Sequence, residues 1–182
     1  MKRLVVGLTG SFGSGKTTVS KIFQKLGAKK VMSADQIVRD KFWPSKARRK
    51  QIAREVFTNP RKRRALEAVI HPFVRRRMTS EIKKVKNGII VLEVPLLFEA
   101  KFDRLCDVTV TVVAGKSNLA KRLVRSGFSR QEVNARLQAQ LSEQEKMRKS
   151  DFIISNKGSK KLLRKHAKFV WRKLILQFKK EN

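Results

Sequence analysis

A short apolar run, Leu4 to Leu8, leads directly into a glycine-rich loop that ends in Lys16-Thr17. A strand, a curled glycine loop and a helix must follow one another here, because glycines let successive N–H groups face one anion and the helix presents its positive end to it. Lys16 would then reach the β- and γ-phosphates of a nucleoside triphosphate, and Thr17 would offer its hydroxyl to Mg²⁺. The residues expected to bind this nucleoside triphosphate are Gly10, Ser11, Phe12, Gly13, Ser14, Gly15, Lys16, Thr17 and Thr18.

Five apolar runs bounded by turn residues have the pattern of strands that are buried on both faces. The segments between them read as helices, so the chain predicts an α/β fold with a parallel sheet. The expected strands cover Arg3 to Thr9, Lys29 to Met32, Gly88 to Val94, Val108 to Val113 and Phe152 to Ile154.

Helix patterns fill the intervals, and proline and glycine mark their ends. The last one is an amphipathic packing helix with an apolar stripe from Leu163 to Phe178, for which a membrane-surface helix is the alternative. The other expected helices run from the loop to Leu26, from Ala34 to Trp43, from Pro44 to Phe57, in pieces separated by Pro60 and Pro72 up to about Lys86, from Lys116 to Ser126, and from Arg130 to Lys149 after a Ser129 cap.

Net charge is the unusual property of the composition: 45 Lys and Arg against 14 Asp and Glu give +31. Such a charge attracts polyanions, so nonspecific nucleic-acid affinity is one interpretation and a solvated basic surface is the other. The single cysteine, Cys106, reads as a small hydrophobe. Without a long apolar stretch we expect no membrane span, a cytoplasmic location, and a monomer or small homo-oligomer.

Two acidic residues follow expected strands, where the carboxyl ends of a parallel sheet meet the phosphate loop. Asp35 could accept the proton of an attacking hydroxyl, with a helix N-cap as the alternative. Glu93 ends the apolar strand Ile89 to Leu92, and an unpaired buried charge there would be costly, so a role in binding the metal, directly or through a water, is favoured for Glu93 as it is for Thr17.

Basic side chains further along suit a lid over the transferring phosphoryl group. Arg122, Arg125 and Arg136 lie on the two expected helices after the fourth strand, although any single arginine in a chain this basic is more often a surface residue. His71 is either a structural histidine or an acceptor-binding one. Glu99 could be an ordinary surface acid.

Taken together, the motifs resemble the dephospho-CoA kinase family over nearly the whole chain. The resemblance rests on the loop with Gly7 to Thr18, on Ala34-Asp35-Gln36-Ile37-Val38-Arg39, on His71-Pro72, on Pro95-Leu96-Leu97-Phe98-Glu99, on Arg136 with Gln140, and on Ser150 to Ile154 followed by Asn156 and Gly158.

The resemblance implies a P-loop NTPase three-layer fold in a single kinase domain over 1–182, with a short helical acceptor-binding insertion at about 40–86 and a helical lid at about 116–148. It implies transfer of phosphate from ATP, with Mg²⁺, to the ribose 3′-hydroxyl of dephospho-CoA. Asp35 aligns with the presumed base and acts with Lys16, Arg122 and Arg125. Acceptor binding falls to Thr9, Asp35, Arg39, His71 and Glu99, and ATP binding extends to Asn156 and Gly158.

This chain departs from the family pattern at a few positions. Ser33 stands where an aspartate is usual, Ser11 replaces the second loop glycine, and Glu93 replaces an aspartate. The stretch between Arg39 and His71 is short for the family. Two alternatives therefore stay open: a related kinase with another alcohol acceptor, and a nucleic-acid-binding relative with a vestigial nucleotide site.

Overall fold

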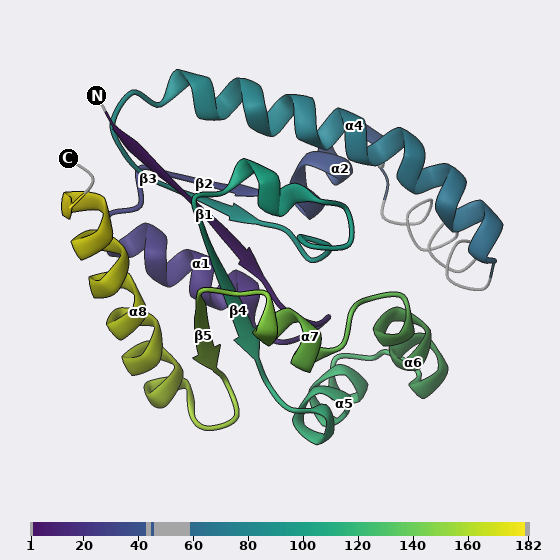
Figure 1. Cartoon of the computed structure of the whole chain (residues 1–182). Helices are drawn as coiled ribbons and strands as arrows, with labels where there is room; N and C mark the ends of the chain where they lie inside the picture. The colour runs from purple at the N-terminus through teal and green to yellow at the C-terminus, as the bar shows by residue number, and fades with distance from the viewer. Residues whose placement is uncertain (1, 43–44, 46–58, 181–182) are drawn as a thin grey trace.

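A computed structural model of the chain describes residues 2–42, 45 and 59–180. Its centre is a five-stranded sheet in the order β2-β3-β1-β4-β5, and every pairing is parallel (Figure 1). The predicted α/β fold is confirmed, with strand ends that shift by no more than one residue. The strands are β1 (Arg3–Thr9), β2 (Lys30–Ser33), β3 (Gly88–Glu93), β4 (Val108–Val113) and β5 (Phe152–Ser155).

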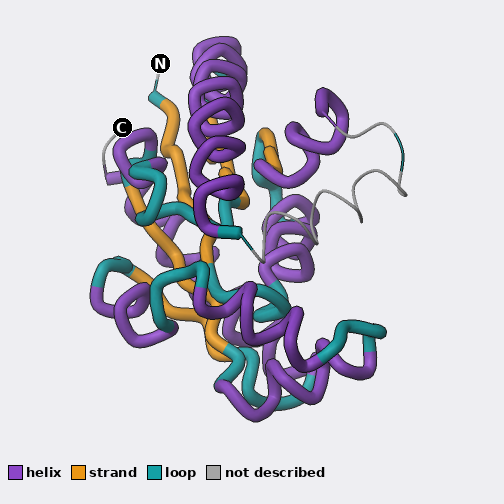
Figure 2. Tube along the Cα trace, turned by 90° about the vertical axis from the view of Figure 1, so that its right-hand side faces the viewer, coloured by secondary structure: helices purple, strands orange, loops and turns teal. Residues whose placement is uncertain are grey.

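Both faces of the sheet are buried, which explains why the strands read as unbroken apolar runs. Leu4, Val6 and Leu8 of β1 pack in a core with α1 and α8, whereas Val5 points to a second core with α2 and α4. Figure 2 shows the strands, in orange, between helices on both sides. The molecule therefore has three layers, and β1 carries the phosphate loop into the middle of the sheet.

The helices connect these strands in the order that the sequence predicted. Gly27 follows the first of them with φ 109°, a left-handed conformation that suits glycine. The helices are α1 (Lys16–Lys25), α2 (Ala34–Phe42), α4 (Pro60–Lys84), α5 (Lys116–Arg125), α6 (Arg130–Gln138), α7 (Glu143–Arg148) and α8 (Lys160–Lys180), with a 3-10 turn η1 (Phe102–Leu105).

Helix α4 corrects one expectation, because it continues through Pro72 rather than dividing there. Pro72 is exposed, so the carbonyl that it leaves without a helical partner can be solvated. Val74, Met78 and Ile82 anchor the following half of the helix in the core. The helix begins at Pro60, and Asn59 caps it by accepting from the N–H groups of Arg61 and Lys62. The basic helix expected from Pro44 to Phe57 lies outside the described residues.

A second correction concerns the helix expected from Arg130 to Lys149, which is two helices, α6 and α7. Ser129 caps α6 as expected. Ser142 forms another capping box, in which its hydroxyl accepts from Glu145 N at 3.2 Å and its N–H donates to the Glu145 carboxylate at 2.9 Å. This local bonding starts a new helix, and it leaves Gln140 and Leu141 outside both helices.

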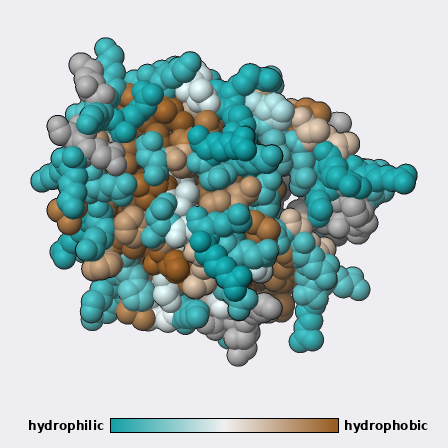
Figure 3. Space-filling model, in the orientation of Figure 1, coloured by the Kyte–Doolittle hydropathy of each residue, from teal (hydrophilic) through white to brown (hydrophobic). Residues whose placement is uncertain are grey.

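The expected lid comprises α5, α6 and α7. Figure 1 shows α5 and α6 beyond the arrowhead of β4, at the end of the sheet where the phosphate loop lies. On the face drawn in Figure 3, hydrophilic side chains surround hydrophobic ones that gather nearer the middle. Among the described residues, no helix has the combination of length and hydropathy that crossing a bilayer requires.

Candidate active site

The phosphate loop follows β1 and has the conformation that its glycines permit. Gly10 and Gly15 adopt φ values of 146° and 100°, which other residues rarely adopt. Crowding adds a second reason for glycine, because a Cβ would lie 2.3 Å from Val112 O at Gly10 and 2.4 Å from Asn156 Nδ2 at Gly15. The loop is thus held by β4 on one side and by the segment after β5 on the other.

Lys16 is buried at the start of α1, and its ammonium group donates to the carbonyls of Gly10 and Ser11 at 2.9 and 3.0 Å. Burial lowers the pKa of Lys16 to about 8, against the opposing charge of Asp35. Within the described part of the chain, the buried hydroxyl of Ser14 has no hydrogen-bond partner. A phosphate group in the loop would give Lys16 an anion and Ser14 an acceptor.

Thr17 and Glu93 meet at the base of the loop. The Thr17 hydroxyl donates to Glu93 Oε1 at 2.6 Å, and the Ser20 hydroxyl donates to Glu93 Oε2 at 2.8 Å. These hydrogen bonds account for a carboxylate that is almost fully buried at the end of β3. The pair also presents hydroxyl and carboxylate oxygens, the donor set that Mg²⁺ prefers, so the residues fit that ion.

Asp35 lies in the first turn of α2, directly after β2. The hydrogen bond from the Gln36 N–H goes to Ser33 Oγ, at 3.4 Å, so the residue at the cap is Ser33. Partial removal of the Asp35 carboxyl from water raises its pKa. The positive charge of Lys16 lowers this pKa, and the negative charge of Glu93 raises it further. Asp35 is exposed, yet its carboxyl group interacts with the charges of Lys16 and Glu93. A carboxylate with a raised pKa is a better proton acceptor than an ordinary one.

The residues expected on the acceptor side lie on several elements. Arg39 is one turn beyond Asp35 on α2, where its guanidinium contacts Gln36 and its charge lowers the Asp35 pKa. The Thr9 hydroxyl donates to the Pro95 carbonyl at 3.1 Å, which joins the end of β1 to the loop after β3.

His71 lies farther along the same side, on α4. Its ring packs edge-to-face on Phe102 with centroids 6.1 Å apart, and burial lowers its pKa. Arg75, one turn on, covers the same Phe102 ring at 4.8 Å and donates to the Ala100 carbonyl at 2.7 Å. His71 and Arg75 thus bring α4 against the loop that carries Glu99.

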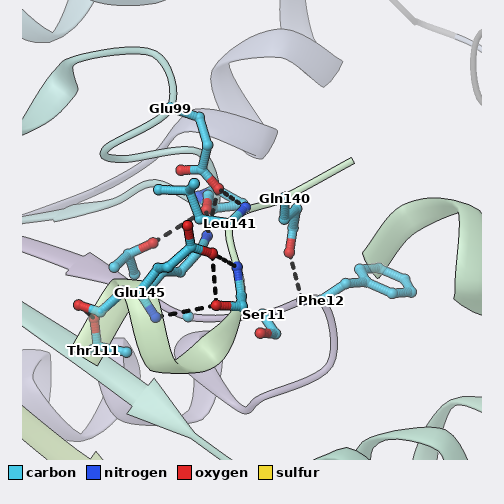
Figure 4. Close-up of polar contacts among 12 residues, drawn as sticks. Ser11, Phe12, Glu99, Thr111, Gln140, Leu141 and Glu145 are labelled. Atoms are coloured by element: carbon cyan, nitrogen blue, oxygen red, sulfur yellow. Dashed lines mark hydrogen bonds and ion pairs between the residues drawn. The ribbon is translucent and has the colours of Figure 1, made fainter. Parts of the chain in front are cut away.

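The Glu99 carboxylate has two partners within the protein. Its Oε1 accepts from Leu141 N at 2.9 Å and pairs with the Lys146 ammonium at 3.0 Å, while Oε2 is buried with no hydrogen-bond partner among the described residues. Figure 4 shows Glu99 facing the segment that contains Gln140 and Leu141. An unsatisfied buried oxygen is consistent with the expected acceptor contact, which stays a prediction.

The three lid arginines have different surroundings. Arg122 donates to the Asn156 carbonyl at 2.9 Å, and Arg125 is exposed on α5. The Arg136 guanidinium lies 4.7 Å from the ring of Phe12 in the phosphate loop and 5.3 Å from the ring of Phe128. The structure therefore brings Arg136 to the loop by cation–π contacts.

The segment after β5 is hydrogen-bonded to the phosphate loop. Asn156 is buried, and its side-chain amide donates to the Ser14 carbonyl at 2.7 Å. Gly158 is exposed two residues later. Asn156 thus contacts the phosphate loop directly, while the expected contact with adenine stays a prediction for both residues.

Sequence reasoning missed Ser20, Arg75 and Lys146. Ser20 lies one helical turn after Thr17, so spacing could have placed it beside Glu93. Arg75 lies four residues after His71, and this helical spacing is the available signal. Lys146 is fully buried in a helix where lysine normally faces solvent, and no local pattern marks it.

Comparison with known families supports one assignment. A family model described as dephospho-CoA kinase matches residues 44–161. The match begins after the phosphate loop, so it depends on the later motifs rather than on a loop that many kinases share. A relative from Symbiobacterium thermophilum named dephospho-CoA kinase is 38% identical, with 92% of this chain and 80% of that protein covered. One from Thermus thermophilus is 33% identical, with 92% and 90% covered.

Solved structures agree with these sequence matches. The crystal structure of TT1252 from Thermus thermophilus has a TM-score of 0.77 and 33% identity, over 96% of this chain and 99% of that one. A dephospho-CoA kinase from Campylobacter jejuni has a TM-score of 0.60 and 26% identity, over 94% and 97%. A shikimate kinase from Bacteroides thetaiotaomicron, with a TM-score of 0.63 and 17% identity over 94% and 98%, shares the fold.

Proposed function

The chain belongs to the dephospho-CoA kinase family, and we propose from this membership that it phosphorylates the ribose 3′-hydroxyl of dephospho-CoA with ATP, giving coenzyme A and ADP. The observation that carries the proposal is the meeting of three features at the carboxyl end of the sheet. Lys16 begins α1 directly after the phosphate loop, the Thr17 hydroxyl is hydrogen-bonded to Glu93 at the end of β3, and Asp35 follows β2.

Each of these residues has a distinct role in the proposed reaction. The 3′-oxygen of the acceptor attacks the γ-phosphorus, the bond from that phosphorus to the β–γ bridging oxygen breaks, and Asp35 takes the hydroxyl proton. When ATP binds, the Lys16 ammonium group donates to phosphate oxygens instead of the carbonyls of Gly10 and Ser11. Its positive charge then stabilises the negative charge that develops on the leaving ADP. Thr17 and Glu93 would hold Mg²⁺, which when bound neutralises charge on the β- and γ-phosphates.

The acceptor would lie between α2, α4 and the loop after β3. Arg39 beside Asp35, and the His71 and Arg75 pair against Phe102, supply cationic and polar groups there for a ligand that carries a pyrophosphate. Arg122, Arg125 and Arg136 are the lid residues that could cover the transferring group. Arg136 already stacks on Phe12, so it contacts the phosphate loop without any movement of the lid.

The test of the function is the release of ADP from MgATP with and without dephospho-CoA, with the product identified by mass. Shikimate and gluconate are the control acceptors, because kinases of both names share the fold at low identity. We expect acceptor-dependent ADP and a product of the mass of coenzyme A. Release of ADP with another alcohol alone would contradict the assignment.

Asp35→Asn tests the proposed base. We expect kcat to fall by a factor of about 10² to 10⁴, because the hydroxyl proton then has no acceptor, while the affinity for MgATP changes by less than about threefold. Asp40→Asn is the matched control, since Asp40 is an exposed carboxylate on the same helix. Native turnover in the Asp35 variant would rule out this role.

A further inference from the structure

One buried lysine has no part in the proposed chemistry. Lys146 of α7 is 0% exposed, and its ammonium group donates to the Pro95 carbonyl at 2.6 Å as well as pairing with Glu99 at 3.0 Å. Burying a lysine is costly unless its charge is paired and hydrogen-bonded, and both conditions are met here. Lysines are abundant on the surface of this chain, so a buried one with fixed partners requires a specific explanation.

The two partners of Lys146 lie in one loop, and each of them is hydrogen-bonded to a further part of the fold. Pro95 and Glu99 belong to the loop after β3, and the Pro95 carbonyl also accepts from Thr9 at the end of β1. Glu99 accepts the N–H of Leu141, in the short segment between α6 and α7. Pro95, Glu99, Leu141 and Lys146 are called the clamp below.

The clamp continues into the phosphate loop. Gln140 precedes Leu141, and its Oε1 accepts the N–H of Phe12 at 3.1 Å (Figure 4). Holding Leu141 at Glu99 therefore also holds Gln140 at Phe12. Hydrogen bonds thus connect three segments: the loop after β3, the segment between α6 and α7, and the phosphate loop. The Lys146 charge also lowers the pKa of Lys16, which shows that the two ammonium groups interact.

We propose that Lys146 is a positioning residue. It acts through Glu99 and Pro95 to hold the loop after β3, and the segment between α6 and α7, in a fixed position relative to the phosphate loop. The inference rests on the proposed function for its kinetic consequence. The clamp joins the loop after β3, where the acceptor is proposed to bind, to the phosphate loop, where ATP is proposed to bind, and phosphoryl transfer needs the two substrates in line. A misplacement of about 1 Å can cost roughly 10²-fold in rate, so loss of the clamp should reduce kcat more than substrate binding.

The variant must remove the pair without leaving one charge buried. Lys146→Met alone would leave the Glu99 carboxylate without its cation, which can unfold the protein. The double variant Lys146→Met/Glu99→Met replaces both side chains by uncharged ones of similar length, and the Pro95 carbonyl keeps Thr9. Lys149→Met is the matched control, because Lys149 is exposed and follows the same helix.

We expect the double variant to melt within about 5 °C of the wild type, with kcat lowered about 10- to 100-fold and KM for ATP changed less than about threefold. The Lys149 variant should match the wild type. Native kcat in the double variant would overturn the inference. A raised acceptor KM with unchanged kcat would also overturn it, because it would assign Glu99 to direct acceptor contact.

Amide hydrogen exchange tests the clamp independently of the reaction. In the double variant we expect faster exchange at Phe12 and Leu141, whose N–H groups donate in the hydrogen bonds that connect the three segments, and unchanged exchange in β4. Unchanged protection at both amides would contradict the clamp even if the chain made coenzyme A. Conversely, if the wild type made none, faster exchange would still support the clamp while the proposed function failed.

Discussion

Lys16 shows how burial prepares a residue for its ligand. The side chain lies in the loop with two carbonyl oxygens as partners, and its pKa is lowered to about 8. Carbonyl oxygens stabilise an ammonium group less than phosphate oxygens do, since phosphate carries a full charge. Binding of a triphosphate should therefore raise the pKa of Lys16.

This predicts proton uptake when ATP binds under mildly alkaline conditions. At about pH 8.5 the ATP phosphates are fully ionised, while most Lys16 is neutral and would gain roughly 0.7 proton on binding. Calorimetric titration of MgATP in buffers of different ionisation enthalpy measures this uptake. Lys21→Met, which changes an exposed lysine of the same helix, should keep it. Binding heats that are identical in all buffers would contradict the prediction.

Single residues were predicted best where their role is local. The loop glycines, Lys16 and Thr17 follow from a contiguous motif, and a hydrogen bond from Thr17 to Glu93 brings the two expected metal-binding residues together. Glu93 was noticed because an acid ends an apolar strand. The contacts of Glu99 could not be predicted, because its partners Leu141 and Lys146 follow it by more than forty residues.

Among the helices, α4 is joined to the edge strand β2 by one carboxylate in addition to its contacts in the core. Glu81 accepts from Lys30 of β2 and from Lys84 at 2.7 Å, and Arg77 lies 3.7 Å away. The hydrogen bonds from Lys30 and Lys84 lower its pKa from 4.5 to about 2. Because the folded pKa is below the ordinary one, Glu81 contributes stability above pH 4.5, and this contribution is lost as the pH falls toward 2.

Glu81→Gln tests this attachment. We expect a lower melting temperature at pH 7, by roughly 2 to 5 °C, and a smaller further loss than in the wild type between pH 4.5 and 2. Thermal melts across that pH range measure both. Glu67→Gln changes another carboxylate of α4, which pairs with Arg63 at 3.7 Å, and should keep the wild-type pH dependence. Parallel pH profiles for Glu81→Gln and the wild type would disprove the role.

Element boundaries were predicted where local signals agree with the tertiary contacts. Strand ends shifted little, because turn residues bound each buried run. Pro72 misled the prediction, since its effect on a helix depends on whether the exposed carbonyl can be solvated and on the core contacts of Val74 and Met78. The break between α6 and α7 was overlooked although Ser142 and Glu145 form a recognisable capping box.

The whole molecule carries a charge that the active site does not require. With +31 at pH 7, the surface should attract any polyanion, and we propose a secondary, nonspecific affinity for nucleic acid. Of the two interpretations of this charge, only nucleic-acid binding predicts a strong dependence on salt, because bound phosphates release their counterions.

Fluorescence anisotropy with a labelled DNA duplex measures this affinity. We expect binding to weaken at least about tenfold between 50 and 200 mM KCl, independently of duplex sequence. Saturating MgATP should leave DNA bound, because Lys16 is buried and belongs to a separate site. Lack of measurable binding at 50 mM salt would favour the solvated basic surface, and displacement by MgATP would place DNA at the phosphate loop.

The sequence by itself determined the parallel α/β fold, the phosphate loop and the residues that follow β1, β2 and β3. These depend on neighbours within a few positions, on glycine conformations and on apolar runs, all of which are local properties. Tertiary structure alone decided that Asn156 braces Ser14, that Arg136 stacks on Phe12, and that Lys146 is buried against Glu99 and Pro95. Those contacts join residues far apart in the chain, and only packing of the lid and loops against the sheet brings them together.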